Sequence, residues 1–295
     1  MTEKKLLFIV NPKAGKAQIK NHLLGITDIF IKAGYRVETH ITQSKGDASS
    51  LVAELDEDYD LLVLSGGDGT LDEVVNGMMK NGRKYPLGYI PAGSTNDFAR
   101  SLGIPSDMIK AAHIAVGDNV FSCDIGQFND DTFIYIAGFG LFTEISYETP
   151  QGLKNLFGHA AYILSAVKSL AMIPNYLIQV EANGELIQDR FIYGMITNSV
   201  SVGGFKGITG KDVRLDDGDF EVMLIKVPND FFQLNEIIGV LTGIVAESDM
   251  IYNFKASHIR IRSRECVPWT LDGENGGEHW SVDIKNHHKK INILI

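Results

Sequence analysis

The stretch that most constrains the fold of this chain is residues 60–76, DLLVLSGGDGTLDEVVN. Residues 61–64 read as a buried strand, and the pattern from Thr70 onward is that of a helix. The glycines between them let backbone N–H groups approach an anion without interference from Cβ atoms, and the helix N-terminus adds a positive dipole. The stretch therefore predicts a phosphate-binding turn, although the glycines alone also fit an ordinary strand-to-helix connection.

An aspartate inside this turn, Asp68, narrows the range of ligands that the turn could bind. The turn is not a Walker A loop, because no GK[ST] follows at the required spacing, and it is not the GxGxxG dinucleotide fingerprint. A carboxylate next to a diphosphate is repulsive unless a cation lies between them. Asp68 therefore indicates a magnesium-bound nucleotide.

Strand and helix patterns alternate over the first 115 residues. Strands are expected at 6–10, 35–42, 61–64 and 87–90, and helices near 18–33, 47–55, 70–80, 95–102 and 106–115. This alternation predicts a doubly wound, parallel α/β nucleotide-binding domain, residues 1–125, whose ligands bind at the carboxyl ends of the strands. Three candidate loops fall at such ends: 11–16, 66–70 and 91–97.

From about residue 120 strand patterns dominate. We expect strands at 119–125, 132–138, 177–182, 186–196, 219–227, 251–263, 265–271 and 279–285, and helices near 153–172 and 230–247. Asn183-Gly184 is the strongest hairpin signal in the chain. Residues 126–285 are therefore predicted to form an all-β domain, either an antiparallel β-sandwich or a barrel-like domain. After a turn at 286–288, residues 286–295 supply a last strand that could return to the first domain.

The overall composition restricts the partners and the compartment. Lysine and arginine total 27 against 37 for aspartate and glutamate, and the net charge of −10 disfavours nucleic-acid binding. Two cysteines without a CxxC spacing argue against a disulfide framework and a zinc site. The longest apolar run, 237–246, is shorter than a membrane span, and no export signal is evident. We expect a cytoplasmic protein with no transmembrane segment and no nucleic-acid partner.

Two of the candidate loops have alternative readings. In NPKAGK, 11–16, Gly15 frees backbone amides and a lysine could contact a phosphate, but a solvated turn fits equally well. In STNDF, Ser94 and Asp97 have the spacing of a capping box, which favours a helix cap for Asp97. A nucleotide or metal role remains compatible, because that helix N-terminus would face the same crevice as the 66–70 loop.

Two acidic segments follow later in the chain. RLDDGDF, 214–220, is either a hairpin turn or a small oxygen-ligand cation site, and its composition favours the turn. In WTLDGE, 269–274, an extended conformation would place Asp272 and Glu274 on one side, where paired acids can keep one group basic enough to accept a proton. A DG hairpin turn accounts for the same residues.

The combination of motifs is more specific than any of its parts. GGDGT at 66–70, an NPxxG segment after the first strand, PxGSTNDFA at 91–99 and DGE at 272–274 together resemble the bacterial diacylglycerol kinase-like lipid kinases. GGDG alone is shared with NAD kinases and, as GGDGS, with phosphofructokinases. The resemblance covers nearly the whole chain, and it implies ATP as co-substrate, Mg²⁺, and transfer of the γ-phosphoryl group to the free hydroxyl of a diacylglycerol-like lipid.

The resemblance also implies roles for individual residues. Asp272 is similar to the general base, with Glu274 as its supporting acid, and the metal-linked acidic network falls on Asp68, Asp97 and Asp124. The residues implied to line the nucleotide are Asn11, Pro12, Lys13, Ala14, Gly15, Thr42, Gly66, Gly67, Asp68, Gly69, Thr70, Leu71, Asp72 and Ser94. A structural magnesium site is implied at the Asp217 side chain and the main-chain oxygens of Arg214 and Asp219.

Two positions depart from the family pattern. Ala14 replaces a common serine, which removes a hydroxyl contact, and Asp72 replaces a common asparagine, which adds negative charge near the phosphates. The lipid substrate implies transient, peripheral contact with the membrane surface, and a homodimer is compatible. The rivals are a soluble-substrate kinase such as an NAD kinase, which NPKAG and DGE disfavour, and a non-catalytic nucleotide module, which the intact Asp272 and Glu274 disfavour.

Overall fold

The computed structural model describes residues 4–94, 96–141, 173–198, 201–202, 205–206 and 214–295. The chain divides into two compact units, which we call unit 1 (Met1–Asp124 with Lys289–Ile295) and unit 2 (Ile125–His288). The helix expected at 153–172 lies outside the described residues. Among the residues that are described, no helix is long and apolar enough to cross a membrane.

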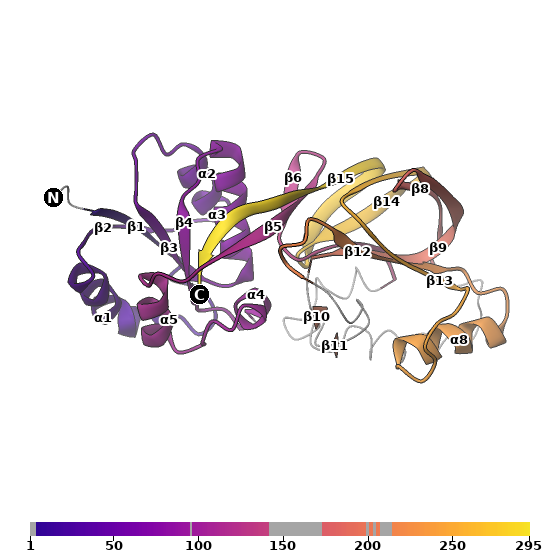
Figure 1. The fold of residues 1–295 in the computed structure, drawn as a ribbon, viewed down its shortest axis with the longest axis horizontal. Helices are drawn as coiled ribbons and strands as arrows, with labels where there is room; N and C mark the ends of the chain where they lie inside the picture. The colour runs from indigo at the N-terminus through magenta and orange to yellow at the C-terminus, as the bar shows by residue number, and fades with distance from the viewer. Residues whose placement is uncertain (1–3, 95, 142–172, 199–200, 203–204, 207–213) are drawn as a thin grey trace. The chain divides into compact units, whose positions relative to one another are not determined.

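Unit 1 is built on a parallel sheet. Its strands, in spatial order, are β2 (Tyr35–Ile41), β1 (Lys4–Val10), β3 (Leu61–Gly66), β4 (Pro86–Pro91) and the end of β15 (Glu274–Leu294). Its helices are α1 (Ile19–Lys32), α2 (Asp47–Ala53), α3 (Asp68–Asn81), α4 (Asp97–Ser101) and α5 (Met108–Ala115). Helix α1 packs beside α5 and α2 beside α3, and the two pairs cover opposite faces of the sheet (Figure 1).

The burial of unit 1 follows from its sequence periodicity. All six residues of β3 are buried, as expected for a central strand that is covered on both faces. The buried side chains of α3 recur at helical spacing, at Leu71, Val74, Val75 and Met78, and form one apolar stripe. Gly82, with φ of 77°, ends this helix in the left-handed conformation that glycine adopts without strain.

Unit 2 is predominantly antiparallel. Its strands are β6 (Asp131–Phe133), β7 (Ile136–Gly140), β8 (Tyr176–Ala182), β9 (Glu185–Thr197), β10 (Ser201–Val202), β11 (Phe205–Lys206), β12 (Phe220–Lys226), β13 (Ile251–Ala256), β14 (His258–Leu271) and most of β15, and its helix is α8 (Phe231–Leu241). Strand β5 (Val120–Phe128) and β15 run from one unit into the other. The long strands β9 and β14 each pair with β8 along one part of their length and with β7 along another part.

Aromatic side chains fill the core of unit 2. Trp269 is 1% exposed, and its ring centroid lies 5.0 Å from that of Phe128 and 4.9 Å from that of Phe139. Gly194 lies directly beneath Phe139, because a Cβ at this position would overlap the phenyl ring. The strand glycine is therefore required by packing in the core of the sandwich.

The mixed α/β fold followed by an antiparallel, sandwich-like domain confirms that part of the predicted fold class. The predicted hairpin at Asn183-Gly184 is also confirmed, because both residues have positive φ and Ala182 pairs with Glu185. The predicted end of the late helix at 247 is wrong. Helix α8 ends at Leu241, where Gly243, with φ of 74°, terminates it.

Three further local predictions are wrong. The turn expected at 286–288 does not form, because β15 is continuous through these residues. The strand expected at 251–263 is interrupted at Ser257, and β14 then runs without a break to Leu271. The residue before α4 is Asn96, with φ of 49°, so Ser94 is not the N-cap that a capping box requires.

Candidate active site

Asn11 joins two of the three predicted loops in unit 1. It directly follows β1, and its backbone N–H donates to the carbonyl of Ser65 at the end of β3, at 2.9 Å. Its side-chain Nδ2 donates to the hydroxyl of Thr70 in the first turn of α3, also at 2.9 Å, while its Oδ1 accepts from the N–H of Lys13. One side chain therefore fixes the NPKAG segment against the GGDGT turn.

Glycines bring the third loop, 91–93, against the other two. Gly15 has φ of 52°, and a Cβ there would overlap the carbonyl oxygen of Ala92. A Cβ on Gly67 would lie 3.2 Å from the Cα of Gly93, which is tighter than ordinary contact. The three loops therefore meet at the carboxyl ends of β1, β3 and β4, as predicted for a parallel sheet.

Helix α3 directs its N-terminus into this group of loops. Gly67 is its N-cap and Asp68 its first residue, and the carbonyl of Gly67 accepts the N–H groups of Thr70 and Leu71. The N–H groups at the start of a helix have no intrahelical acceptor, so this end carries partial positive charge. Leu71 is 1% exposed and contributes to the core, whereas Asp72, the next residue, is half-buried.

The remaining nucleotide candidates lie near the same strand ends. Thr42 is buried and its N–H donates to the carbonyl of Val10 at 2.9 Å. Of the residues after β1, Ala14 is buried, Pro12 is half-buried and Lys13 is exposed. Ser94 is also exposed. Gly66 ends β3, Gly69 is exposed in the first turn of α3, and the side chain of Asp97 lies outside the described part of the chain.

The sequence prediction missed Asn96, which shapes the loop after β4. Its Oδ1 accepts the N–H of Gly93 and its Nδ2 donates to the carbonyl of the same residue, both at 2.9 Å. Asparagine tolerates the left-handed backbone that Asn96 adopts. Its position within PAGSTND was a usable signal, because asparagine is common where a loop must bond to its own backbone.

Asp124 is fully buried at the point where β5 leaves unit 1. One of its carboxylate oxygens accepts the N–H of Lys289 at 2.7 Å, which ties residues 289–295 to β5. Burial and the charge of Asp124 raise the pKa of the neighbouring Cys123 thiol to about 12. Cys123 is therefore a packing residue and not a reactive thiol.

In unit 2 the Asp272-Gly273 pair forms a hairpin turn between β14 and β15. Their φ values are 49° and 83°, and Leu271 pairs with Glu274 across the turn. The extended conformation considered for 269–274 is therefore wrong, and Glu274 is exposed at the start of β15. Two consecutive positive φ values are typical of a type I′ turn, which favours Asp-Gly.

The carboxylate of Asp272 binds three consecutive backbone N–H groups. Its Oδ2 accepts from Ile134 at 2.6 Å, and its Oδ1 accepts from Tyr135 at 3.0 Å and from Ile136 at 2.9 Å. Successive amides that converge on one anion form a concave binding site for negative charge. These bonds stabilise the charged form of the carboxylate and fix its orientation.

Two residues that the sequence prediction missed hold this amide segment in place. The hydroxyl of Thr197 donates to the carbonyl of Tyr135 at 2.6 Å, and the N–H of Asn198 donates to the same oxygen at 3.0 Å. Both residues are almost fully buried at the end of β9. The phenol of Tyr135 also donates to the carbonyl of Asp272 at 2.9 Å.

The 214–219 segment of unit 2 precedes β12. The Oδ1 of Asp217 accepts the N–H of Asp219 at 3.2 Å, and its Oδ2 lies 2.9 Å from Nζ of Lys255. The same Nζ lies 3.1 Å from Oε1 of Glu221, whose side chain is 7% exposed. The Arg214 guanidinium is 3.8 Å from Asp216. Within the described residues no group of three or more histidine, cysteine or acidic side chains is arranged to hold a metal.

Burial and neighbouring charges shift the pKa values of Glu221 and Lys255. Burial raises the pKa of Glu221 to about 7, although the nearby ammonium of Lys255 acts in the opposite direction. Burial alone would lower the pKa of Lys255, but the carboxylates of Asp217 and Glu221 hold it above its usual value. The ammonium therefore stays charged at neutral pH and compensates the buried acid.

The two family models that match the chain follow its two halves. Residues 5–128 match the diacylglycerol kinase catalytic domain, and residues 145–288 match the YegS C-terminal NAD kinase beta sandwich-like domain. The diacylglycerol kinase of Bacillus subtilis is 38% identical, with 93% of this chain and 91% of that protein covered. The chain belongs to the diacylglycerol kinase family. The resemblance seen in its motifs is thereby confirmed.

Other relatives of this family agree with the assignment. The diacylglycerol kinase of Staphylococcus carnosus is 34% identical, with 93% of this chain and 90% of that protein covered. The fold is similar to a solved structure of a diacylglycerol kinase from Bacillus anthracis, with a TM-score of 0.76, 24% identity, and 100% and 97% of the two chains covered. As a member of the family the chain is a phosphotransferase with an alcohol group as acceptor.

Proposed function

We propose that this family member is an ATP-dependent lipid kinase that phosphorylates the free hydroxyl of a diacylglycerol-like lipid to give a product of the phosphatidic acid type. The observation that carries the proposal is the meeting of three loops around the N-terminus of α3, with Asp68 in its first turn. Family members from Bacillus subtilis and Staphylococcus carnosus, which match over 91% and 90% of their own length, are named diacylglycerol kinases.

The donor set of unit 1 fits a magnesium-bound nucleotide. Helix-terminal N–H groups and the amides of Gly66, Gly67 and Gly69 would bind phosphate oxygens, because glycine itself has no side chain to intervene. The carboxylates of Asp68 and Asp124 supply the hard oxygen atoms that Mg²⁺ prefers. We assign the nucleotide to the positions inferred from the sequence: Asn11, Pro12, Lys13, Ala14, Gly15, Thr42, Gly66, Gly67, Asp68, Gly69, Thr70, Leu71, Asp72, Ser94, Asp97 and Asp124.

Asp272 is our candidate for the general base. A base must be ionised before it accepts a proton, and the three N–H groups of 134–136 favour that form. The carboxylate would take the proton as the hydroxyl attacks and becomes more acidic. Glu274 is proposed as the supporting acid. Bound Mg²⁺ would offset the charge that develops on the transferring phosphoryl group.

Several finer assignments belong to the same proposal. We describe unit 1 as a doubly wound domain, which the two helix pairs on opposite faces of its sheet support. Contact with the membrane is proposed to be transient and peripheral, on the cytoplasmic side, because a net charge of −10 gives no general attraction to anionic lipid. A homodimer is compatible with the proposal. The structural magnesium that the resemblance implies at Arg214, Asp217 and Asp219 is not part of this proposal, because Asp217 is paired with Lys255.

The experiment that tests the function offers radiolabelled ATP with a panel of acceptors: diacylglycerol, phosphatidylglycerol, ceramide, sphingosine and NAD. We expect label in a lipid with a free hydroxyl, in a magnesium-dependent reaction. Asp68→Ala serves as the matched control, because it removes the carboxylate of the phosphate-binding turn and should abolish turnover. Label in NAD alone would overturn the lipid-kinase proposal.

A further inference from the structure

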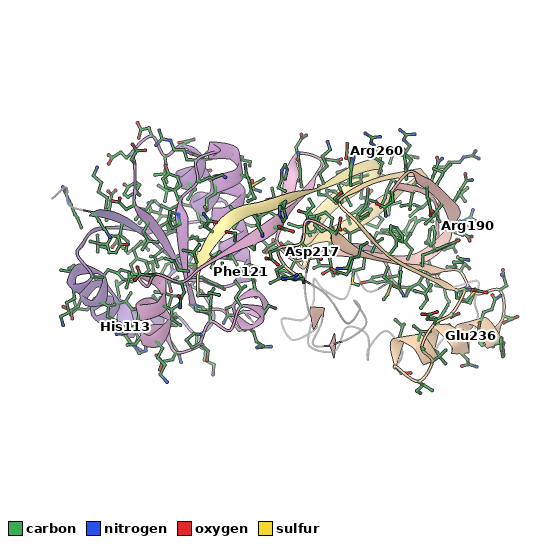
Figure 2. The ribbon with its side chains drawn as sticks, in the orientation of Figure 1. His113, Phe121, Arg190, Asp217, Glu236 and Arg260 are labelled. Atoms are coloured by element: carbon green, nitrogen blue, oxygen red, sulfur yellow. The ribbon has the colours of Figure 1, made fainter. Side chains whose placement is uncertain are left out.

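The loop before β12 is fastened to the sheet by a lysine. Asp217 lies in this loop (Figure 2), and Lys255 reaches it from β13, the neighbouring edge strand. In the β12–β13 register Lys255 stands opposite Glu221, so one ammonium contacts a loop carboxylate and a strand carboxylate at 2.9 and 3.1 Å. The contacts join three segments of unit 2 through a single positive charge.

The two carboxylates depend on this charge to different degrees. The side chain of Glu221 is 7% exposed, whereas that of Asp217 is 22% exposed. A buried carboxylate without a counter-charge is strongly unfavourable. Lys255, with 40% of its side chain exposed, is the cation that lies within ion-pair distance of Glu221 among the described residues.

A divalent cation at Asp217 conflicts with this arrangement. Mg²⁺ takes oxygen ligands at about 2.1 Å in near-octahedral geometry. One oxygen of Asp217 faces the ammonium of Lys255 and the other accepts the N–H of Asp219. A metal bound to this carboxylate would lie only a few ångströms from the ammonium of Lys255, and two cations that close repel each other. The residues of this loop therefore do not fit the structural magnesium that the resemblance implies.

We infer that the ammonium of Lys255 supplies the positive charge at the Asp217 loop and takes the place of a structural metal ion there. The loop is thereby closed by a covalently attached cation that cannot be removed by a chelator. The inference is independent of the proposed function, because it involves neither nucleotide nor lipid.

The direct test counts bound ions, with Mn²⁺ as the probe in the absence of nucleotide. Free Mn²⁺ is measured by electron paramagnetic resonance for the full chain and for Asp217→Asn. We expect the two proteins to bind the same number of Mn²⁺ ions. One ion fewer in Asp217→Asn would overturn the inference, and this arm needs no variant of Lys255.

The complementary test removes the ammonium. Lys255→Met keeps the aliphatic stem, and we expect its melting temperature to fall by at least about 4 °C in chelator, because Glu221 loses its counter-charge. Mg²⁺ should then restore at least half of the loss, and the double variant with Asp217→Asn should not respond. Full retention of the wild-type melting temperature in chelator would contradict the inference.

Lys285→Met is the matched control for this series. Lys285 is similarly exposed in unit 2 and pairs with Asp283 at 3.4 Å, but both partners face solvent. We expect its melting temperature to change by less than about 2 °C and to show the same response to Mg²⁺ as the wild type. A gain of magnesium dependence in this control would show that any lost lysine produces the effect, which would also overturn the inference.

Discussion

Two hairpin turns of unit 2 have nearly the same backbone and different surroundings. Asn183-Gly184 joins β8 to β9 with φ values of 54° and 77°, and Asp272-Gly273 joins β14 to β15 with φ values of 49° and 83°. The amide of Asn183 donates one bond, to the carbonyl of Lys255 at 2.7 Å, and is exposed. The carboxylate of Asp272 accepts three buried N–H groups.

A turn dipeptide therefore determines the backbone conformation but not the role of its side chain. Both turns need two residues that tolerate positive φ, and Asn-Gly and Asp-Gly meet that need equally. The role of Asp272 is decided by residues 134–136, which lie far away in the sequence and present three N–H groups to it. The turn therefore positions a carboxylate, and the segment that joins β6 to β7, together with the first residue of β7, supplies the N–H groups that bind it.

The largest expected effect comes from Asp272→Asn, which gives both hairpins the same turn dipeptide. Asparagine keeps the turn but cannot accept the proton, so phosphorylation should slow by about 10²- to 10⁴-fold. Nucleotide affinity should be unchanged. The measurement combines the phosphorylation rate with ATP affinity and melting temperature.

The reverse exchange, Asn183→Asp, is the control for that prediction and should leave the rate unchanged. A folded, ATP-binding Asp272→Asn protein that keeps more than about a tenth of the wild-type rate would show that Asp272 is not the base.

The second prediction tests whether the positive φ values of the exposed turn require glycine for stability, as expected for both turns. Gly184→Ala forces a Cβ onto a residue with φ of 77°, and it should destabilise unit 2 by about 1 to 2 kcal/mol although the site is spacious. Urea unfolding followed by fluorescence measures the loss. Gly25→Ala in α1 is the control, because its φ is not positive and alanine should be neutral or stabilising there. Equal stability of Gly184→Ala and wild type would argue against the strained turn.

The third prediction concerns Thr197, which holds the backbone segment that binds the Asp272 carboxylate. Thr197→Val removes the hydroxyl that holds the carbonyl of Tyr135, and we expect a loss of about 1 kcal/mol in unfolding free energy. The phosphorylation rate should fall by less than in Asp272→Asn, because Asn198 still binds the same carbonyl. Thr197→Ser, which keeps the hydroxyl, should restore the rate. A rate equal to wild type in Thr197→Val would remove Thr197 as a positioning residue.

The smallest effect is expected at the exposed hairpin. Asn183→Ala loses a single bond to the carbonyl of Lys255, at a site in contact with water, so the cost should be roughly 0.5 kcal/mol. Thermal unfolding in the same buffer as the other variants measures it. A loss larger than that of Thr197→Val would mean that the exposed turn supports its neighbours more than the buried one does.

The sequence predicted the elements of unit 1 closely, because strand and helix periodicities there are regular and glycines mark the loops. The prediction failed at residues 286–288, where a polar Asn-His-His segment suggested a turn but is part of the continuous strand β15. It also could not find Lys255, because the lysine sits on a strand with an alternating, solvent-facing pattern and its partners are reached only after β12 and β13 pair. In the site, the meeting of the three loops could be predicted because each loop follows the carboxyl end of a parallel strand. The three N–H groups that bind Asp272 could not be predicted, because tertiary packing brings them to it.

The path of the chain between the units has a consequence for synthesis on the ribosome. Unit 1 takes residues 1–124 first and residues 289–295 only after all of unit 2, and Asn292 and Ile293 then pair with β4. At about 5 to 20 residues per second the delay is on the order of 10 to 30 s. During that time one edge of the unit 1 sheet is exposed to other chains. A nascent chain arrested before residue 289 should therefore depend on chaperones far more than the finished one.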